Sequence, residues 1–90
     1  MEYLINHHPE HNRFTTEADG YTAYVVFCLA DGSLDILHTI VPPPLEGKGI
    51  AAALVKKAYE YAAEQGLTPK ASCIYAARWL ERHPKDVSKQ

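Results

Sequence analysis

One stretch near the middle of the chain, PPPLEGKGIAAA at residues 42–53, separates two halves that have different hydrophobic periods. Its prolines fix the backbone φ angle and cannot donate to a β-ladder, so a strand has to end before them. Its two glycines flank Lys48 and come directly before small apolar residues that favour a helix. The chain therefore divides into a first part rich in strands and a second part that is mainly helical.

The residues before this stretch show the pattern of three antiparallel strands. A short β-prone segment at 13–16 comes first, and the aromatic and β-branched segment 21–29 ends at Asp31-Gly32, a strong hairpin signal. The next segment, 33–41, alternates as a third strand would. The alternation assigns one face of this third strand to Leu34, Ile36, His38 and Ile40. A three-stranded meander is the simplest assembly of these segments.

The residues after this stretch change to a helical period. Apolar side chains within 50–65 recur on one broad stripe, and Gly66 follows where a left-handed C-cap residue is favoured. Segment 67–72 has the length of one strand, which the helical crossover places parallel to the third strand. A second, shorter helix at 74–82 ends before a proline. The expected fold class is α+β, with the order β-β-β-α-β-α and two helices packed on the sheet.

Composition and charge restrict the classes of function. The 90 residues suit a single domain spanning 1–90, with a core at about 12–85. A formal net charge of -2 gives no reason to expect nucleic acid or an anionic membrane as a partner. No apolar run approaches the roughly 18 residues of a membrane span, and the N-terminus lacks a secretion signal. Cys28 and Cys73 form no CxxC pair, so neither a disulfide framework nor a metal site is expected, and a cytoplasmic location is predicted.

Gly47 and Gly49 give the loop before the helix the character of a phosphate site. They place unhindered backbone amides where the helix that begins near Ile50 leaves its first N–H groups without partners. That end also carries about half a positive charge from the aligned peptide dipoles. A Walker A loop is excluded because Lys48 lies between the glycines and no Ser or Thr follows. A dinucleotide-binding loop is excluded because no carboxylate follows about 20 residues later. A rigid connection that binds nothing is the alternative.

The loop resembles the acetyl-CoA loop of the GNAT-type N-acetyltransferase superfamily, whose pattern is (Q/R)xxGx(G/A). The pattern maps onto residues 46–51, where the glycine and the alanine agree and Glu46 replaces the preferred Gln or Arg. Other segments extend the resemblance, over about residues 12–85, to a branch of small single-domain GNAT-like proteins in which Glu is tolerated at this position. These segments are RF at 13–14, LHTIVP at 37–42, LEGKG at 45–49, AALV at 52–55, and Cys73 followed by RHP at 82–84.

The resemblance implies a minimal fold that binds acetyl-CoA. The pyrophosphate would lie on the amides of the loop, and the pantetheine would enter a splay between the third and fourth predicted strands. The residues implied to contact the cofactor are Val41, Glu46, Gly47, Lys48, Gly49, Ile50, Ala51, Cys73 and Arg78. Larger members carry helices that help to form the acceptor pocket where this chain has only a turn at 17–20. The acceptor site is therefore expected to be open, shared with a second subunit, or completed by the substrate.

Two residues are candidates for the chemistry. His38 lies on the strand that leads to the loop, and imidazole suits a base that deprotonates an amine near neutral pH; an interior histidine is the alternative. Cys73 follows the fourth strand, near the implied position of the thioester, where a helix N-terminus favours thiolate. An acyl-cysteine intermediate is one route, but most of the superfamily transfers the acetyl group directly, and direct transfer is expected here.

The predicted function is that of an N-acetyltransferase, which moves an acetyl group from acetyl-CoA to an amine of a small molecule or a protein. A CoA-binding or protein-interaction module without turnover is the alternative from a different class. Release of free CoA thiol in the presence of an amine distinguishes the two. The sequence identifies neither the acceptor nor the pathway, and it is compatible with a monomer or a homodimer.

Overall fold

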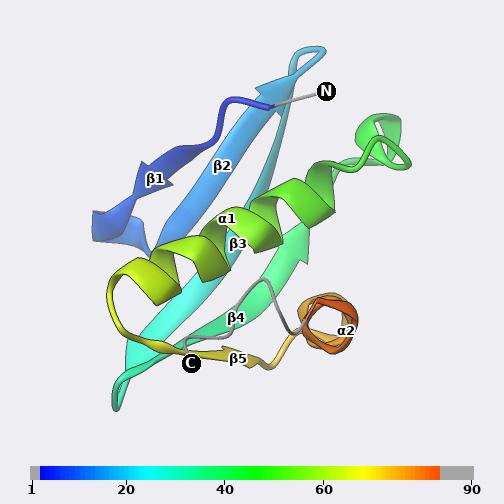
Figure 1. Ribbon diagram of the computed structural model, residues 1–90. Helices are drawn as coiled ribbons and strands as arrows, with labels where there is room; N and C mark the ends of the chain where they lie inside the picture. Colours follow the sequence, from blue (N-terminus) through cyan, green and yellow to red (C-terminus); the bar gives the residue numbers. More distant parts are fainter. Residues whose placement is uncertain (1–2, 84–90) are drawn as a thin grey trace.

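A computed structural model describes residues 3–83 of the chain, drawn as a ribbon in Figure 1. Its strands form one sheet in the order β1-β2-β3-β4-β5, which is also their order along the chain. The first four strands are antiparallel, and β5 lies parallel to β4. The strands are β1 (Asn6–His8), β2 (Arg13–Ala18), β3 (Tyr21–Ala30), β4 (Ser33–Ile40) and β5 (Thr68–Ala71); the helices are α1 (Ile50–Glu64) and α2 (Ile74–Arg82), with short 3-10 turns at Pro9–His11 and Pro43–Leu45.

This architecture confirms the α+β class and the order of the elements expected from the sequence, with one further strand at the start. The three expected antiparallel strands are β2, β3 and β4, the crossover helix is α1, and the parallel strand is β5. Both tight turns of the meander are Asp-Gly pairs with positive φ at each position, 54° and 80° at Asp19-Gly20 and 53° and 74° at Asp31-Gly32. Such turns match the right-handed twist of paired strands, which is why Asp-Gly predicts a hairpin.

β1 is an edge strand that the sequence did not predict. It pairs with β2, where His7 lies opposite Phe14. The His7 ring stacks on Phe14 with centroids 4.4 Å apart and meets the edge of Tyr61 from α1 at 4.5 Å. The imidazole therefore packs as an aromatic side chain, which explains how a strand of polar residues joins the sheet. Its buried Nε2 has no hydrogen-bond partner in the described part of the chain.

A β-bulge interrupts the pairing of β3 with β4. Val26 of β3 pairs with His38, but the next residue, Phe27, pairs with Ile36. Leu37 is therefore the extra residue and has no direct partner on β3. A bulge of this kind adds one residue to the strand and shifts the alternation of side chains beyond it by one position.

The bulge reverses the orientation of the residues that follow it. Leu34 and Ile36, before the bulge, are buried, whereas His38 and Ile40, after it, are exposed. The prediction that these four side chains share one face is wrong, because the extra residue breaks the regular alternation. The alternative of an interior His38 is wrong for the same reason. Thr39 takes the side of the core instead, and it is only partly exposed.

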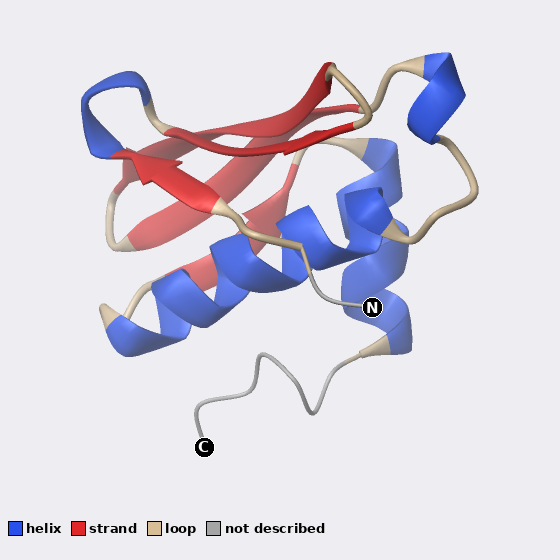
Figure 2. Cartoon of the chain, turned by 90° about the horizontal axis from the view of Figure 1, so that it is seen from above, coloured by secondary structure: helices blue, strands red, loops and turns tan. Residues whose placement is uncertain are grey.

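Both α-helices lie on the same face of the sheet, as the view from above shows (Figure 2). α1 runs diagonally across that face (Figure 1). No helix of the described residues covers the opposite face, which we name the outer face. The core between the sheet and the helices contains Phe14, Ala23, Val25, Phe27, Leu34, Ile36, Leu45, Ile50, Leu54, Val55, Ala58, Tyr59, Ala62, Ala76 and Trp79.

Glycines in left-handed conformations mark both ends of α1. Gly49 precedes the helix with a φ of 78°, and Gly66 follows it with a φ of 72°, as the sequence predicted for Gly66. The N–H of Leu67 donates to the carbonyl of Ala62 at 2.8 Å and so closes the last turn. Within residues 3–83, no helix combines the length and the apolar character that a membrane span requires.

Leu54→Ala tests the packing of α1, because Leu54 is completely buried against the sheet. The cavity left behind should lower the free energy of unfolding by about 2–5 kcal/mol. Lys57→Ala, on the exposed side of the same helix, should change it by less than about 0.5 kcal/mol. Urea unfolding followed by circular dichroism measures both variants. Equal losses would contradict the described orientation of α1.

Candidate functional site

The loop between β4 and α1 is anchored at one end and bare at the other. The 3-10 turn Pro43–Leu45 buries Leu45 completely in the core. Beyond it, Gly47 and Gly49 both have left-handed backbones, with φ angles of 80° and 78°. A Cβ atom at either glycine would meet no protein atom within 4 Å, so the backbone conformation and not crowding requires glycine here. The open space in front of the loop is available to a ligand.

A cavity of about 260 Å³ adjoins this loop at the N-terminus of α1. The first N–H groups of the helix lack intrahelical partners, and the bond from the Ala53 N–H to the Gly49 carbonyl, at 3.1 Å, is the first of the helical series. Leu45, Ala52 and Tyr75 contribute to the lining. So do six residues that the sequence assigned to the cofactor: Val41, Glu46, Gly47, Gly49, Ile50 and Ala51.

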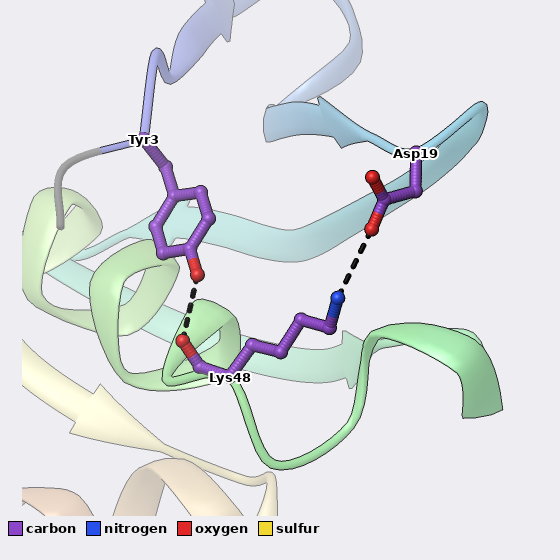
Figure 3. Close-up of polar contacts among 3 residues, drawn as sticks. All are labelled: Tyr3, Asp19 and Lys48. Carbon is purple, nitrogen blue, oxygen red and sulfur yellow. Dashed lines mark hydrogen bonds and ion pairs between the residues drawn. The ribbon is translucent and has the colours of Figure 1, made fainter.

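Lys48, the remaining residue of the loop, points its side chain toward the turn between β2 and β3 (Figure 3). Its Nζ forms an ion pair with Asp19 Oδ2 at 3.0 Å, and its carbonyl accepts a hydrogen bond from the Tyr3 hydroxyl at 2.7 Å. The ion pair is solvent-exposed and adds little stability. The two contacts nevertheless connect the loop to the N-terminal segment and to the hairpin. The Lys48 side chain, assigned to the cofactor from the sequence, therefore contacts the protein in this structure.

A second cavity, of about 330 Å³, lies along α2. Ala52 and Tyr75 line both cavities, so the two form a continuous surface that we name the loop–α2 groove. Arg78, which the sequence assigned to the cofactor, lies in this second part. Spacings of three and four residues place the other lining residues of this part on one side of α2. They are Tyr75, Trp79, Arg82 and His83.

β4 and β5 separate just before α2 begins. They are paired only as far as Ile36 of β4, whereas β4 itself continues to Ile40. The Ile36 carbonyl accepts hydrogen bonds from the backbone N–H groups of Ser72 and Cys73, both at 3.0 Å. The Asp35 carboxylate accepts from the N–H of Ser72 at 2.7 Å and from its hydroxyl at 2.8 Å. These bonds turn the chain out of the sheet and leave the edge of β4 beyond Ile36 without a β5 partner.

Cys73 occupies the N-cap position of α2, where the strands separate. Its thiol donates a hydrogen bond to Thr39 Oγ1 at 3.5 Å. Partial burial raises the pKa of this thiol, but hydrogen bonding by the Ala76 amide, by Thr39 and by the Tyr75 amide stabilises the thiolate and lowers the pKa below its ordinary value overall. A thiol in this environment is more often in its nucleophilic form.

Tyr75 lies where the two parts of the groove meet. Burial raises the pKa of its hydroxyl, the positive charge of Arg82 opposes this effect, and the Cys73 thiolate adds to it. The net shift is upward, so the hydroxyl stays protonated at neutral pH and can donate a hydrogen bond. Its side chain remains accessible, with 41% of the residue exposed.

His38, the second catalytic candidate from the sequence, is on the outer face of the sheet. It lies opposite Val26 and is exposed. Adjacent residues of a strand point to opposite faces, and Thr39 contacts Cys73. His38 and Cys73 are therefore on different sides of β4, and His38 does not line the loop–α2 groove.

The histidines near the N-terminus make separate contacts. His8 Nε2 lies 3.0 Å from Thr15 Oγ1, and His11 Nε2 lies 4.0 Å from Glu10 Oε2. Together with the stacking of His7 on Phe14, these contacts direct the three rings to different neighbours. Within residues 3–83, no three histidine, cysteine or acidic side chains are grouped to hold a metal ion.

The sequence between residues 13 and 89 matches a family described as GCN5-related N-acetyl-transferase. The chain belongs to this family. Protein NATD1 from Homo sapiens is 26% identical to it over 83 residues, which cover 89% of this chain and 74% of NATD1. Protein NATD1 from Xenopus tropicalis is 33% identical over 52 residues, and there the chain spans about half, 48%, of the relative.

A similar fold is found in a GCN5-like protein from Staphylococcus aureus, whose structure was determined in solution by NMR. The two structures align with a TM-score of 0.74 and 29% sequence identity, over 93% of this chain and 83% of the other. The family membership confirms the resemblance drawn from the loop and its flanking segments. The structural alignment confirms that the sheet and helices of this chain form a GNAT-like fold.

Thr39→Val tests the environment of Cys73. The substitution removes the hydroxyl that stabilises the thiolate, so the pKa of Cys73 should rise and its alkylation by iodoacetamide at neutral pH should slow. The rate falls about tenfold for each pH unit below the pKa, so the whole pH profile should move to higher pH. A Cys28→Ser background leaves one thiol to measure. Thr15→Val makes the same change beside His8 and should leave the profile in place; an unmoved profile in Thr39→Val would contradict the assignment.

Proposed function

We propose that this protein binds acetyl-CoA in the loop–α2 groove and transfers its acetyl group to an amine. The main support for the proposal is a cavity at the N-terminus of α1, between the end of β4 and the start of α2, in a chain that belongs to this family. Two glycines with left-handed backbones line this cavity. The N-acetyltransferase activity is that for which the family is named. The acetyl donor and the residues that handle it are inferences from the geometry.

The backbone of the loop is suited to the pyrophosphate of acetyl-CoA. Gly47 and Gly49 leave their amides without a neighbouring side chain, and the first turn of α1 adds N–H groups that have no partner in the helix. The helix dipole at this end favours negative charge. Glu46 works against an anion because its carboxylate lines the same cavity, but the residue is exposed and water screens its charge.

The separation of β4 from β5 is suited to the pantetheine arm. Beyond Ile36, backbone groups on this edge of β4 have no β5 partner, so an extended chain with amide groups can take the place of the missing strand. Cys73 and Thr39 lie at the same point of separation. Cys73 lines neither cavity, but it is the N-cap of α2, two residues before Tyr75, which lines both. We therefore assign the thioester to this end of the groove, near Cys73.

The acceptor nitrogen must lose its extra proton before it attacks, because only the neutral amine has the lone pair that forms the new C–N bond. We assign the removal of this proton to His38. The His38 side chain is exposed on the outer face, where an acceptor can reach the imidazole from solvent. The thioester C–S bond breaks as the C–N bond is completed, and the sulfur leaves as a thiolate. The nitrogen gives up a second proton as it becomes an amide, and the thiolate takes up this proton, which yields free CoA thiol. The protonated hydroxyl of Tyr75 is suited to donate a hydrogen bond to that sulfur.

Cys73 is assigned a position beside the thioester, with direct transfer as the route. Direct transfer leaves the protein unmodified, whereas an acyl-cysteine route would add an acetyl group to Cys73 that intact-mass measurement detects. The lowered pKa of the thiol is the observation that favours the second route. The position of Cys73 on the opposite side of β4 from His38 favours the first, because the thiol and this base then do not form the pair that a nucleophilic cysteine requires.

A CoA-binding module without turnover is the second candidate. It is favoured by the outer face, over which no helix of the described residues builds an acceptor pocket. Only the tight turn Asp19-Gly20 joins β2 to β3. The two candidates differ in one measurement: an enzyme releases free CoA thiol when acetyl-CoA and a suitable amine are mixed with it, whereas a module binds acetyl-CoA and releases none.

Gly49→Val tests the loop. Its branched side chain would fill the open space in front of the helix amides and should weaken acetyl-CoA binding by more than about tenfold, or about 1.4 kcal/mol. Gly66→Val is the matched control, because Gly66 has a similar φ of 72° and an equally open Cβ position at the other end of α1. The free energy of unfolding should fall by a similar amount in both variants. Calorimetry should find a weaker affinity for acetyl-CoA in Gly49→Val alone. If the two folded variants bind acetyl-CoA with equal affinity, the loop is not part of the binding site.

His38→Ala tests the base. The variant should lower kcat in a thiol-release assay with a panel of amines, with little change in acetyl-CoA affinity. A base is needed for turnover and not for binding of the cofactor, so the two measurements should separate. Thr22→Ala, also exposed on the sheet, is the control. A turnover rate unaffected by His38→Ala would exclude His38 as the base.

A further inference from the structure

Two arginines one helical turn apart supply the positive charge in the second part of the loop–α2 groove. Arg78 and Arg82 both line this cavity. Neither forms an ion pair with a carboxylate in residues 3–83, where the ion pairs involve other side chains. Like charges at this spacing repel each other and destabilise a helix. An anion bound between the two guanidinium groups would remove that repulsion.

The cavity also has an aromatic wall. The His83 ring stacks on Trp79 with centroids 4.4 Å apart and an interplanar angle of 21°. The Trp79 carbonyl lies 3.0 Å from His83 Nδ1 and accepts its hydrogen, which holds the imidazole in place. Arg82 acts on Tyr75 electrostatically, so its charge reaches the junction of the two parts of the groove. Trp79 itself is nearly buried, with 6% of the residue exposed, so the rings that this cavity offers to a ligand are those of His83 and Tyr75. Two cations beside these rings suit a nucleotide that carries a phosphate.

The order of these features along the groove indicates which phosphate group of a ligand the second cavity would bind. The glycine loop offers backbone amides to a diphosphate, and the second cavity begins at Ala52 and Tyr75, where the first ends. A ligand that lies on the loop and continues along α2 meets a second anion site there. Coenzyme A has a second phosphate of this kind, on the 3′-oxygen of the ribose in its adenosine.

We propose that Arg78 and Arg82 bind the 3′-phosphate of coenzyme A, so that the protein selects acetyl-CoA over a donor that lacks this group. The inference rests on the proposed function and adds the recognition of the nucleotide end. Guanidinium groups bind phosphate oxygens through two parallel hydrogen bonds, which gives direction as well as charge. Because both arginines are exposed, the selectivity should decrease as ionic strength rises.

Calorimetry with two ligands tests the proposal. Acetyl-CoA and 3′-dephospho-acetyl-CoA differ only in this phosphate, and the second should bind about tenfold more weakly or worse at low salt. In Arg78→Gln/Arg82→Gln, the two ligands should bind with nearly equal affinity, close to that of the dephospho ligand in the unmodified protein. Arg13→Gln is the control, because it removes one positive charge from the side chain that lies over Tyr24, away from the groove, and should preserve the ratio.

The outcomes separate this proposal from the one on which it rests. Binding of both ligands with equal affinity to the unmodified protein would overturn the 3′-phosphate site and leave acetyl-CoA binding intact. A preference for acetyl-CoA that survives in Arg78→Gln/Arg82→Gln would overturn the assignment to these arginines. Binding of neither ligand would overturn the proposed function and this inference with it. A preference that disappears in the double variant and persists in Arg13→Gln supports the site.

Discussion

The carbonyl oxygen of Ile36 accepts two backbone hydrogen bonds, from Ser72 and Cys73, at the last point where β4 and β5 are held together. Asp35 reinforces this point through both polar hydrogens of Ser72. If β5 continued along β4, the edge of β4 would be paired and α2 would begin elsewhere. The direction of α2, the environment of the Cys73 thiol and the second part of the groove all depend on where the strands separate.

The loop before α1 divides its contacts between backbone and side chains. Its glycines present bare backbone to the cavity, while Leu45 is buried in the core and Lys48 contacts Tyr3 and Asp19. This division explains how a loop with two left-handed residues keeps one shape. The side chains hold the loop from the protein side, and the ligand side stays free of them. A sequence pattern that records only residue types does not distinguish these two uses.

Much of the fold could be predicted because its signals are local. The Asp-Gly turns, the change to a helical period and Gly66 each act within a few residues. The orientation of His38 could not be predicted, because it depends on the extra residue Leu37, whose position is set by pairing with β3. β1 was missed because His7 joins the core through aromatic stacking that appears only when Tyr61 is folded against it. The glycines of the candidate site were found from their spacing. The aromatic wall on α2 was not, because the stacking of His83 on Trp79 depends on how the chain leaves the end of that helix.

The order of strands also bears on how the protein folds. β1 to β4 follow one another in space as they do in the chain, and two-residue turns join β2 to β3 and β3 to β4, so these contacts close short loops at small entropic cost. β5 pairs with β4 only after the whole of α1 has crossed the sheet. Pairing between distant segments is slow, so the meander should be in place before β5 and α2 arrive. The groove would then be completed at the end of folding, and a chain with an intact meander could still lack it.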